Sequence, residues 1–187
     1  RVYGEVIDID LSQIPRAVAG PSRPHDRIDF TQARVAFEDV CRDRGLDRSV
    51  RAHVDIEGCG YDLAHGTIAI AAVTSCTTAT DPAMMVACGL LARNAVTRGL
   101  AAKPWIKRIF APGSHATSLL LERAGLSSSL SALGFDLCGF GCMSCIGNSG
   151  PLSAEMHRIS ADIELSSVLS GNRNFEGRIS PDVSQNY

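Results

Sequence analysis

Three cysteines have the residue type and the spacing of a metal site. Cys76 stands in the run VTSCT, and Cys142 and Cys145 form a Cys-x-x-Cys pair within GCMSCIGNSG. Thiolate sulfur is a soft ligand that suits iron–sulfur clusters, and two intervening residues allow both members of the pair to reach one cube. Three ligands on a four-iron cube leave one iron without a protein ligand, and that iron can act as a Lewis acid. The pattern therefore predicts a [4Fe-4S] site.

Other interpretations of the cysteines remain open at this point. A lone Cys-x-x-Cys pair can be a redox dithiol, although this pair lacks the helix that a thioredoxin-like motif needs. A structural zinc site needs a fourth ligand, which Cys138 or Cys59 can supply. Single cysteines are often inert, and we expect Cys88 and Cys138 to be small core residues. Cys41 and Cys59 lie in an irregular segment and receive no role.

A second motif, SGNRNFEGR at 170–178, combines an amide with two arginines. Guanidinium groups such as those of Arg173 and Arg178 bind carboxylates through two parallel hydrogen bonds and stay charged at any pH. Many surface arginines bind nothing, so spacing alone leaves a binding role for this loop undecided. We expect His115 to occupy a solvent-exposed helix position, and the other four histidines show no metal-ligand spacing.

Strand-like and helix-like segments alternate from Gly66 onward. Apolar runs predict strands at 67–73, 105–110, 135–140 and 163–169. Caps and apolar periodicity predict helices at 82–99, 114–125 and 154–159. This order predicts an α/β fold with a mostly parallel sheet covered by helices.

The order of the elements also predicts where the chemistry lies. Cys76, Gly113, Cys142, Cys145 and Arg173 each follow a predicted strand. Ligands of open parallel sheets bind outside the carboxyl ends of the strands. We therefore expect these residues to converge on one edge of the sheet. We also expect Cys76 to immediately precede a helix start, whose positive end favours a thiolate.

Residues 1–65 have a different character from the rest. They predict an N-terminal strand at 6–9, a turn-rich stretch at 19–24, and a charged segment over 31–65 that forms a surface helix followed by a linker. We predict a single domain over 1–187, with these leading elements in 1–65 and an α/β core in 66–187. Both ends of the chain resemble cuts through a polypeptide, so we expect it to be a fragment of a longer multidomain protein.

Composition narrows the class of protein. With 187 residues and 45% apolar content, the chain can bury a core. A net charge of −2 gives no indication of a nucleic-acid partner. Seven unevenly spaced cysteines fit a reducing cytosol better than a secreted disulfide scaffold. We find no signal peptide and no apolar stretch of the roughly 18 residues that a membrane span needs, so a cytoplasmic location is expected.

Four motifs, in this order, resemble the aconitase family: TSCT at 74–77, KPWIK with APGS within 103–114, GCMSCIGNSG at 141–150 and SGNRNFEGR at 170–178. The resemblance is closest to the long branch that includes bacterial aconitase A and the iron-regulatory proteins, and it covers nearly the whole chain. It implies a [4Fe-4S]-dependent lyase that isomerises citrate and isocitrate through cis-aconitate in the tricarboxylic acid cycle. This chain resembles the third of the family's four domains.

The resemblance also implies roles for individual residues. In the family, the cysteines that match Cys76, Cys142 and Cys145 hold the cluster. The asparagine that matches Asn172 hydrogen-bonds near the cluster, and the arginines that match Arg173 and Arg178 hold substrate carboxylate. The family's serine base and histidine–aspartate acid lie in other domains, so we expect no catalytic residue here and an inactive isolated domain. The expected partners are a tricarboxylic acid and the remaining domains of the same polypeptide.

One position departs from the family pattern. Thr78 stands where the family usually has asparagine, so a short hydroxyl replaces an amide. A second hypothesis therefore keeps the chemistry but changes the substrate to methylcitrate, homocitrate or a phosphorus-containing citrate analogue. Two further hypotheses are an RNA-binding iron-regulatory protein, which no basic–aromatic pattern supports, and a non-catalytic metal domain.

Overall fold

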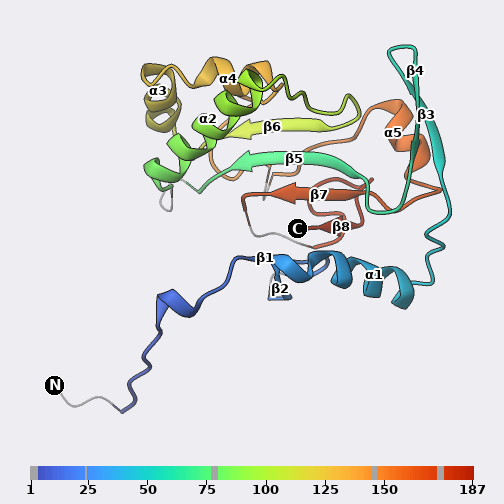
Figure 1. Ribbon diagram of the computed structural model, residues 1–187, viewed down its shortest axis with the longest axis horizontal. Coiled ribbons are helices and arrows are strands. Elements are labelled where there is room, and N and C mark those ends of the chain that lie inside the picture. Colours follow the sequence, from blue (N-terminus) through green and yellow to red (C-terminus); the bar gives the residue numbers. More distant parts are fainter. Residues whose placement is uncertain (1–3, 24, 77–79, 145–146, 172–174) are drawn as a thin grey trace.

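The structure is a computed structural model that describes residues 4–23, 25–76, 80–144, 147–171 and 175–187. The described residues form a four-stranded sheet in the order β6-β5-β7-β8, and every pairing in it is parallel. Its strands are β5 (Ile68–Thr74), β6 (Lys107–Ala111), β7 (Ser166–Leu169) and β8 (Gln185–Asn186). Figure 1 shows these strands side by side with helices packed around them. The predicted α/β fold is confirmed.

Two hydrophobic cores lie on opposite faces of the sheet. Successive side chains of a strand point to opposite faces, and Ile109 and Phe110 of β6 accordingly belong to different cores. Phe110 packs with the helices α2 (Pro82–Thr97), α3 (His115–Arg123) and α4 (Ser127–Ala132). Ile109 packs with α5 (Ala154–Ile159) and with a hairpin described below. The sheet is thus covered on both faces, as parallel sheets require.

The helix after β5 begins and ends as the sequence predicts. The carboxylate of Asp81 accepts a hydrogen bond from the N–H of Ala83, and Pro82 occupies the first turn, where its missing N–H costs nothing. Gly99 follows the helix with a φ of 70°, a conformation that glycine adopts without strain. The helix predicted at 154–159 is also confirmed, with Ser153 as its cap. By contrast, α4 and the two-residue β8 were not predicted.

The predicted linker after the surface helix is wrong. The helix α1 (Ala33–Asp43) is present, but residues 52–63 form an antiparallel hairpin of β3 (Ala52–Ile56) and β4 (Cys59–Leu63). Along β3 the residues alternate between buried and exposed. Glu57 and Gly58 both have positive φ, 54° and 78°, which gives a two-residue turn that matches the twist of the strands. The alternation of buried and exposed residues, followed by Glu57 and Gly58, was the sequence pattern that indicated this hairpin.

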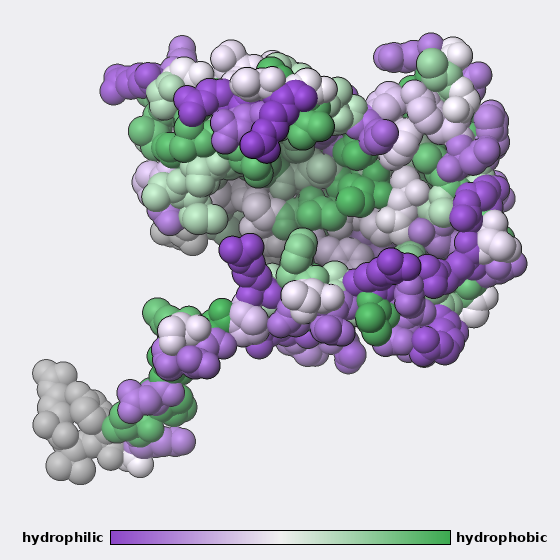
Figure 2. Space-filling view, viewed as in Figure 1, coloured by the Kyte–Doolittle hydropathy of each residue, from purple (hydrophilic) through white to green (hydrophobic). Residues whose placement is uncertain are grey.

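The predicted N-terminal strand at 6–9 is also wrong. Residues 5–10 have no regular structure, and Val6 and Ile7 are 72% and 74% exposed. Figures 1 and 2 show this segment as an arm that extends away from the rest of the described chain. A strand needs a partner for its main-chain N–H and C=O groups, and the arm has none among the described residues. The regular elements that follow are η1 (Leu11–Gln13), β1 (Ala17–Ala19), β2 (Arg27–Asp29) and η2 (Phe30–Gln32).

The third predicted strand, 135–140, is reduced to a single bridge. Leu137 pairs with Phe110 in parallel, held by a hydrogen bond of 3.2 Å from the N–H of Phe110 to the carbonyl of Asp136 and one of 2.9 Å from the N–H of Cys138 to the carbonyl of Phe110. The segment therefore lies beside β6 without forming a full strand. Among the described helices, none is both long and apolar enough to cross a membrane.

Candidate functional site

Hydrogen bonds of the main chain and of two side-chain hydroxyls bring three loops together at the carboxyl edge of the sheet. The N–H of Ser75 donates to the carbonyl of Ala111 at the end of β6 (3.2 Å). The N–H of Thr74 donates to the hydroxyl of Ser170, which follows β7 (2.8 Å), and the Thr74 hydroxyl donates to the carbonyl of Gly141 (3.2 Å). The segments that carry Cys76 and Cys142 therefore lie at one edge, next to the start of the arginine loop.

The main chain at Cys76 is fixed while the residue itself is exposed. The hydroxyl of Thr80 donates to the carbonyl of Cys76 (2.7 Å) and also shares a hydrogen bond of 2.8 Å with the hydroxyl of Ser75. Gly113 lies against this pair, since a Cβ there would be 1.9 Å from Thr80 Oγ1 and 2.9 Å from the carbonyl oxygen of Cys76. The next described helix begins at Pro82. Residues 77–79 lie outside the described residues, so the prediction that Cys76 immediately precedes a helix start is not tested.

Cys142 is also exposed and lies in a tight turn. Gly141 before it has a φ of 64°, and the N–H of Gly147 donates to the carbonyl of Cys142 (3.1 Å). A Cβ on Gly147 would lie 2.5 Å from the carbonyl oxygen of Met143, so this turn requires glycine. Cys145, predicted as the third ligand, lies outside the described residues, as does Thr78.

Arg178 is the predicted substrate-binding residue that the structure describes. Its N–H donates to the carbonyl of Phe175 (3.0 Å), and its own carbonyl accepts from Asn148 Nδ2 (3.1 Å). Its Nε is buried and has no hydrogen-bond partner within the described part of the chain. A buried guanidinium N–H without an acceptor is costly, so the position favours a ligand oxygen. Asn172 and Arg173 lie outside the described residues.

The remaining cysteines differ from the two at the edge. Burial raises the pKa of the Cys41 thiol in α1 and of the Cys88 thiol in α2, so both stay protonated. Cys88 is half-buried and packs against the core that contains Phe110, rather than inside it as predicted. Cys138 is exposed, which corrects the prediction that it is a core residue, and its thiol donates to the carbonyl of Asp136. Cys59 belongs to the hairpin, which Figure 1 shows at the opposite end of β5 from the carboxyl edge.

Histidines contribute no metal site among the described residues. His115 is exposed at the start of α3, as predicted, with its ring edge-on to Phe140 at 6.0 Å between centroids. No group of three His, Cys, Asp or Glu side chains in the described ranges, which leave out Cys145, could hold a metal ion.

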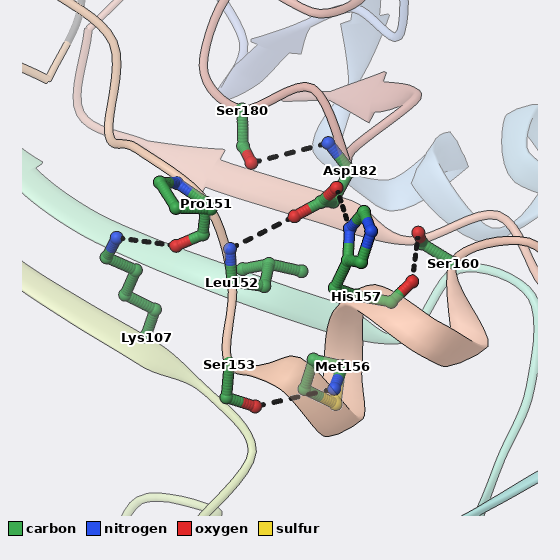
Figure 3. Close-up of polar contacts among 9 residues, drawn as sticks. All are labelled: Lys107, Pro151, Leu152, Ser153, Met156, His157, Ser160, Ser180 and Asp182. Carbon is green, nitrogen blue, oxygen red and sulfur yellow. Dashed lines mark hydrogen bonds and ion pairs between the residues drawn. The ribbon is translucent and has the colours of Figure 1, made fainter.

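A polar network around α5 and the start of β6 was not foreseen from the sequence (Figure 3). Asp182 has a side chain only 4% exposed, and it accepts hydrogen bonds from the N–H of Leu152 (3.0 Å) and from His157 Nδ1 (2.7 Å). Burial by itself would raise the pKa of Asp182, but the Leu152 N–H, His157 and Lys107 together lower it. Lys107 donates to the carbonyls of Ser149 and Pro151. No local pattern links these residues, because they lie far apart in sequence.

Comparison with known proteins shows which family the motifs represent. The family model of aconitase (aconitate hydratase) matches residues 1–187. The chain belongs to the aconitase family. It is 43% identical to aconitate hydratase A of Bradyrhizobium diazoefficiens, over 100% of this chain and 21% of that protein. It is 46% identical to the phosphinomethylmalate isomerase of Streptomyces viridochromogenes, over 99% of this chain and 21% of that protein. The chain thus spans about a fifth of the length of these relatives.

The described part of the site fits the cluster that the family implies. Cys76 and Cys142 are both exposed at the edge, while hydrogen bonds fix their main chains. Thiolates are the usual ligands of iron–sulfur clusters. The donor set of this edge is therefore compatible with a [4Fe-4S] cluster.

Proposed function

We propose that this chain is the cluster-bearing domain, 1–187, of a longer hydro-lyase that isomerises citrate and isocitrate through cis-aconitate. The observation that carries the proposal is the convergence of the Cys76 and Cys142 segments at one sheet edge, in a chain that matches the aconitase family throughout. The reducing cytosol is the compartment that suits such thiolates.

Cys76, Cys142 and Cys145 hold the [4Fe-4S] cluster in this proposal. The bound cluster would supply a Lewis-acidic iron for the substrate hydroxyl. The chain's own residues bind and orient: Arg178, with Asn172 and Arg173, pairs with substrate carboxylates through charge-assisted hydrogen bonds. The groups that move protons come from the rest of the polypeptide, so this chain contributes no catalytic acid or base.

A second candidate has the same chemistry and a different substrate. The chain is 46% identical to a phosphinomethylmalate isomerase, and Thr78 replaces the amide usual in the family. A phosphinate in place of one carboxylate would use the same arginines, because both groups accept paired hydrogen bonds. The substrate is then a phosphorus-containing analogue of citrate.

The test uses the full-length polypeptide, reconstituted with iron and sulfide without oxygen. We expect Cys142→Ser to abolish the cluster absorbance, while Cys59→Ser, at the exposed hairpin, retains it. Arg178→Lys should keep the absorbance and raise the KM for citrate about 10- to 150-fold, because loss of a hydrogen bond to a charged group costs about 1.5–3 kcal/mol. Arg98→Lys, at the exposed end of α2, is the control.

Turnover of citrate against turnover of a phosphinate analogue separates the two candidates. If the wild-type polypeptide takes up no cluster, or processes neither compound, the proposed function is wrong. If Arg178→Lys loses the cluster or keeps wild-type kinetics, the role assigned to Arg178 is wrong while the cluster assignment stands.

A further inference from the structure

Asn148 has a main-chain conformation that few residues accept. Its φ is 81°, in the left-handed region where asparagine and glycine are the favoured residues. Its side-chain Oδ1 accepts a hydrogen bond from the N–H of Gly150 (2.7 Å). This bond fixes which end of the amide faces its own loop, so the NH₂ group faces the neighbouring segment. The backbone and the amide of Asn148 are thus both held in one orientation.

That NH₂ group joins the loop that follows Cys142, which the proposed function assigns to cluster binding, to the segment of Arg178, which it assigns to substrate binding. Asn148 Nδ2 donates to the carbonyl of Arg178 (3.1 Å), and the N–H of Ser149 donates to the next carbonyl, that of Ile179 (2.7 Å). On its other side, the N–H of Gly147 donates to the carbonyl of Cys142 (3.1 Å). A short path of main-chain and amide bonds therefore runs from Cys142 through Asn148 to Arg178.

The chain beyond Asn148 is anchored independently. Lys107 donates to the carbonyls of Ser149 and Pro151. Figure 3 shows its contact with Pro151 and the hydrogen bond from the N–H of Leu152 to Asp182. Residues 149–152 are therefore tied to residues 179–182 and to β6 without help from Asn148. Loss of the Asn148 amide should leave these anchors in place and release the contact at Arg178.

We propose that Asn148 is a positioning residue whose amide sets the place of Arg178 relative to the Cys142 loop. The inference rests on the proposed function, because it assumes that Arg178 binds substrate beside the cluster. Asn148 need not touch substrate. It holds the carbonyl of Arg178, and the Arg178 N–H is held in turn by Phe175, so the guanidinium leaves the main chain from a fixed point.

Two variants isolate the amide donor in the full-length, cluster-loaded polypeptide. Asn148→Asp keeps the acceptor for Gly150 but replaces the NH₂ donor by an oxygen, whereas Asn148→Gly tolerates the φ and removes the side chain without adding charge. Both should raise the KM for citrate or its phosphinate analogue about 3- to 10-fold, the loss expected for one neutral hydrogen bond. The cluster absorbance should stay unchanged. Asn94→Asp, on the exposed surface of α2, is the control.

A double-mutant cycle with Arg178→Lys tests whether Asn148 acts through Arg178. In the Arg178→Lys background, Asn148→Gly should raise KM far less than in the wild type. Independently of activity, hydrogen exchange should accelerate in peptides covering 176–180 in both Asn148 variants and not in Asn94→Asp. Additive effects on KM, or unchanged exchange at 176–180, would overturn the proposal. A wild-type protein without turnover refutes the proposed function instead, and the exchange data still decide whether Asn148 holds the Arg178 segment.

Discussion

Replacing Gly113 with alanine should disturb the main chain that carries Cys76. Gly113 is buried, and a Cβ there would lie 1.9 Å from Thr80 Oγ1 and 2.9 Å from the carbonyl oxygen of Cys76. The first contact is impossible without movement of the Thr80 hydroxyl. That hydroxyl donates to the Cys76 carbonyl and is hydrogen-bonded to the Ser75 hydroxyl. The added methyl group therefore breaks the contacts that hold the Cys76 loop.

The size of the effect follows from these contacts. Overpacking of a filled site costs about 1–3 kcal/mol, and each neutral hydrogen bond lost costs about 0.5–1.5 kcal/mol. We expect Gly113→Ala to lower the free energy of unfolding by about 2–4 kcal/mol. Thr80→Ala should cost about 1–3 kcal/mol through the two hydrogen bonds alone. In the double variant the Thr80 hydroxyl is already gone, so the loss of unfolding free energy should be about 1 kcal/mol smaller than the sum of the two single losses.

Denaturant unfolding of the polypeptide and its three variants measures these differences. Gly4→Ala is the control, since a Cβ at Gly4 meets nothing within 4 Å. Cluster absorbance after reconstitution gives a second measurement, in which Gly113→Ala should retain less cluster than Gly4→Ala. Wild-type stability of Gly113→Ala, or strictly additive costs in the double variant, would refute the assignment of Gly113 as the residue that permits this close approach.

Two further predictions concern the network in Figure 3. Asp182→Asn should lower the free energy of unfolding near pH 7 by about 1.5–3 kcal/mol. Because the folded-state pKa of Asp182 is lowered, its contribution is present above the unfolded pKa and is lost as pH falls below about 4. The deficit against wild type should therefore shrink in acid unfolding experiments, and a deficit independent of pH would contradict this. Lys107→Met removes the donor to two carbonyls and should lower the free energy of unfolding by about 1–3 kcal/mol in the same experiments. Lys103→Met, which replaces an exposed lysine, is the control and should change it little.

The sequence alone determined the local elements and the motifs. Apolar runs and caps predicted β5, α2 and α5 because burial, the Asp81 cap and the N-terminal proline act within a few residues. The motifs identified the family, and the order of strands predicted that the Cys76 and Cys142 loops share one edge. Sequence patterns failed at 6–9 and 135–140, where apolar character was present but a full set of pairing partners was not.

Only the tertiary structure decided how the loops at that edge hold one another. The contact of Gly113 with Thr80, and the bond from Asn148 to Arg178, join residues about 30 positions apart that share no period or spacing. The same holds for Asp182, whose lowered pKa depends on partners from other segments. Local patterns record which face of an element is buried, but they cannot record which loop meets which. Which loops meet depends on the order of the parallel strands in the sheet, because this order sets which carboxyl ends become neighbours.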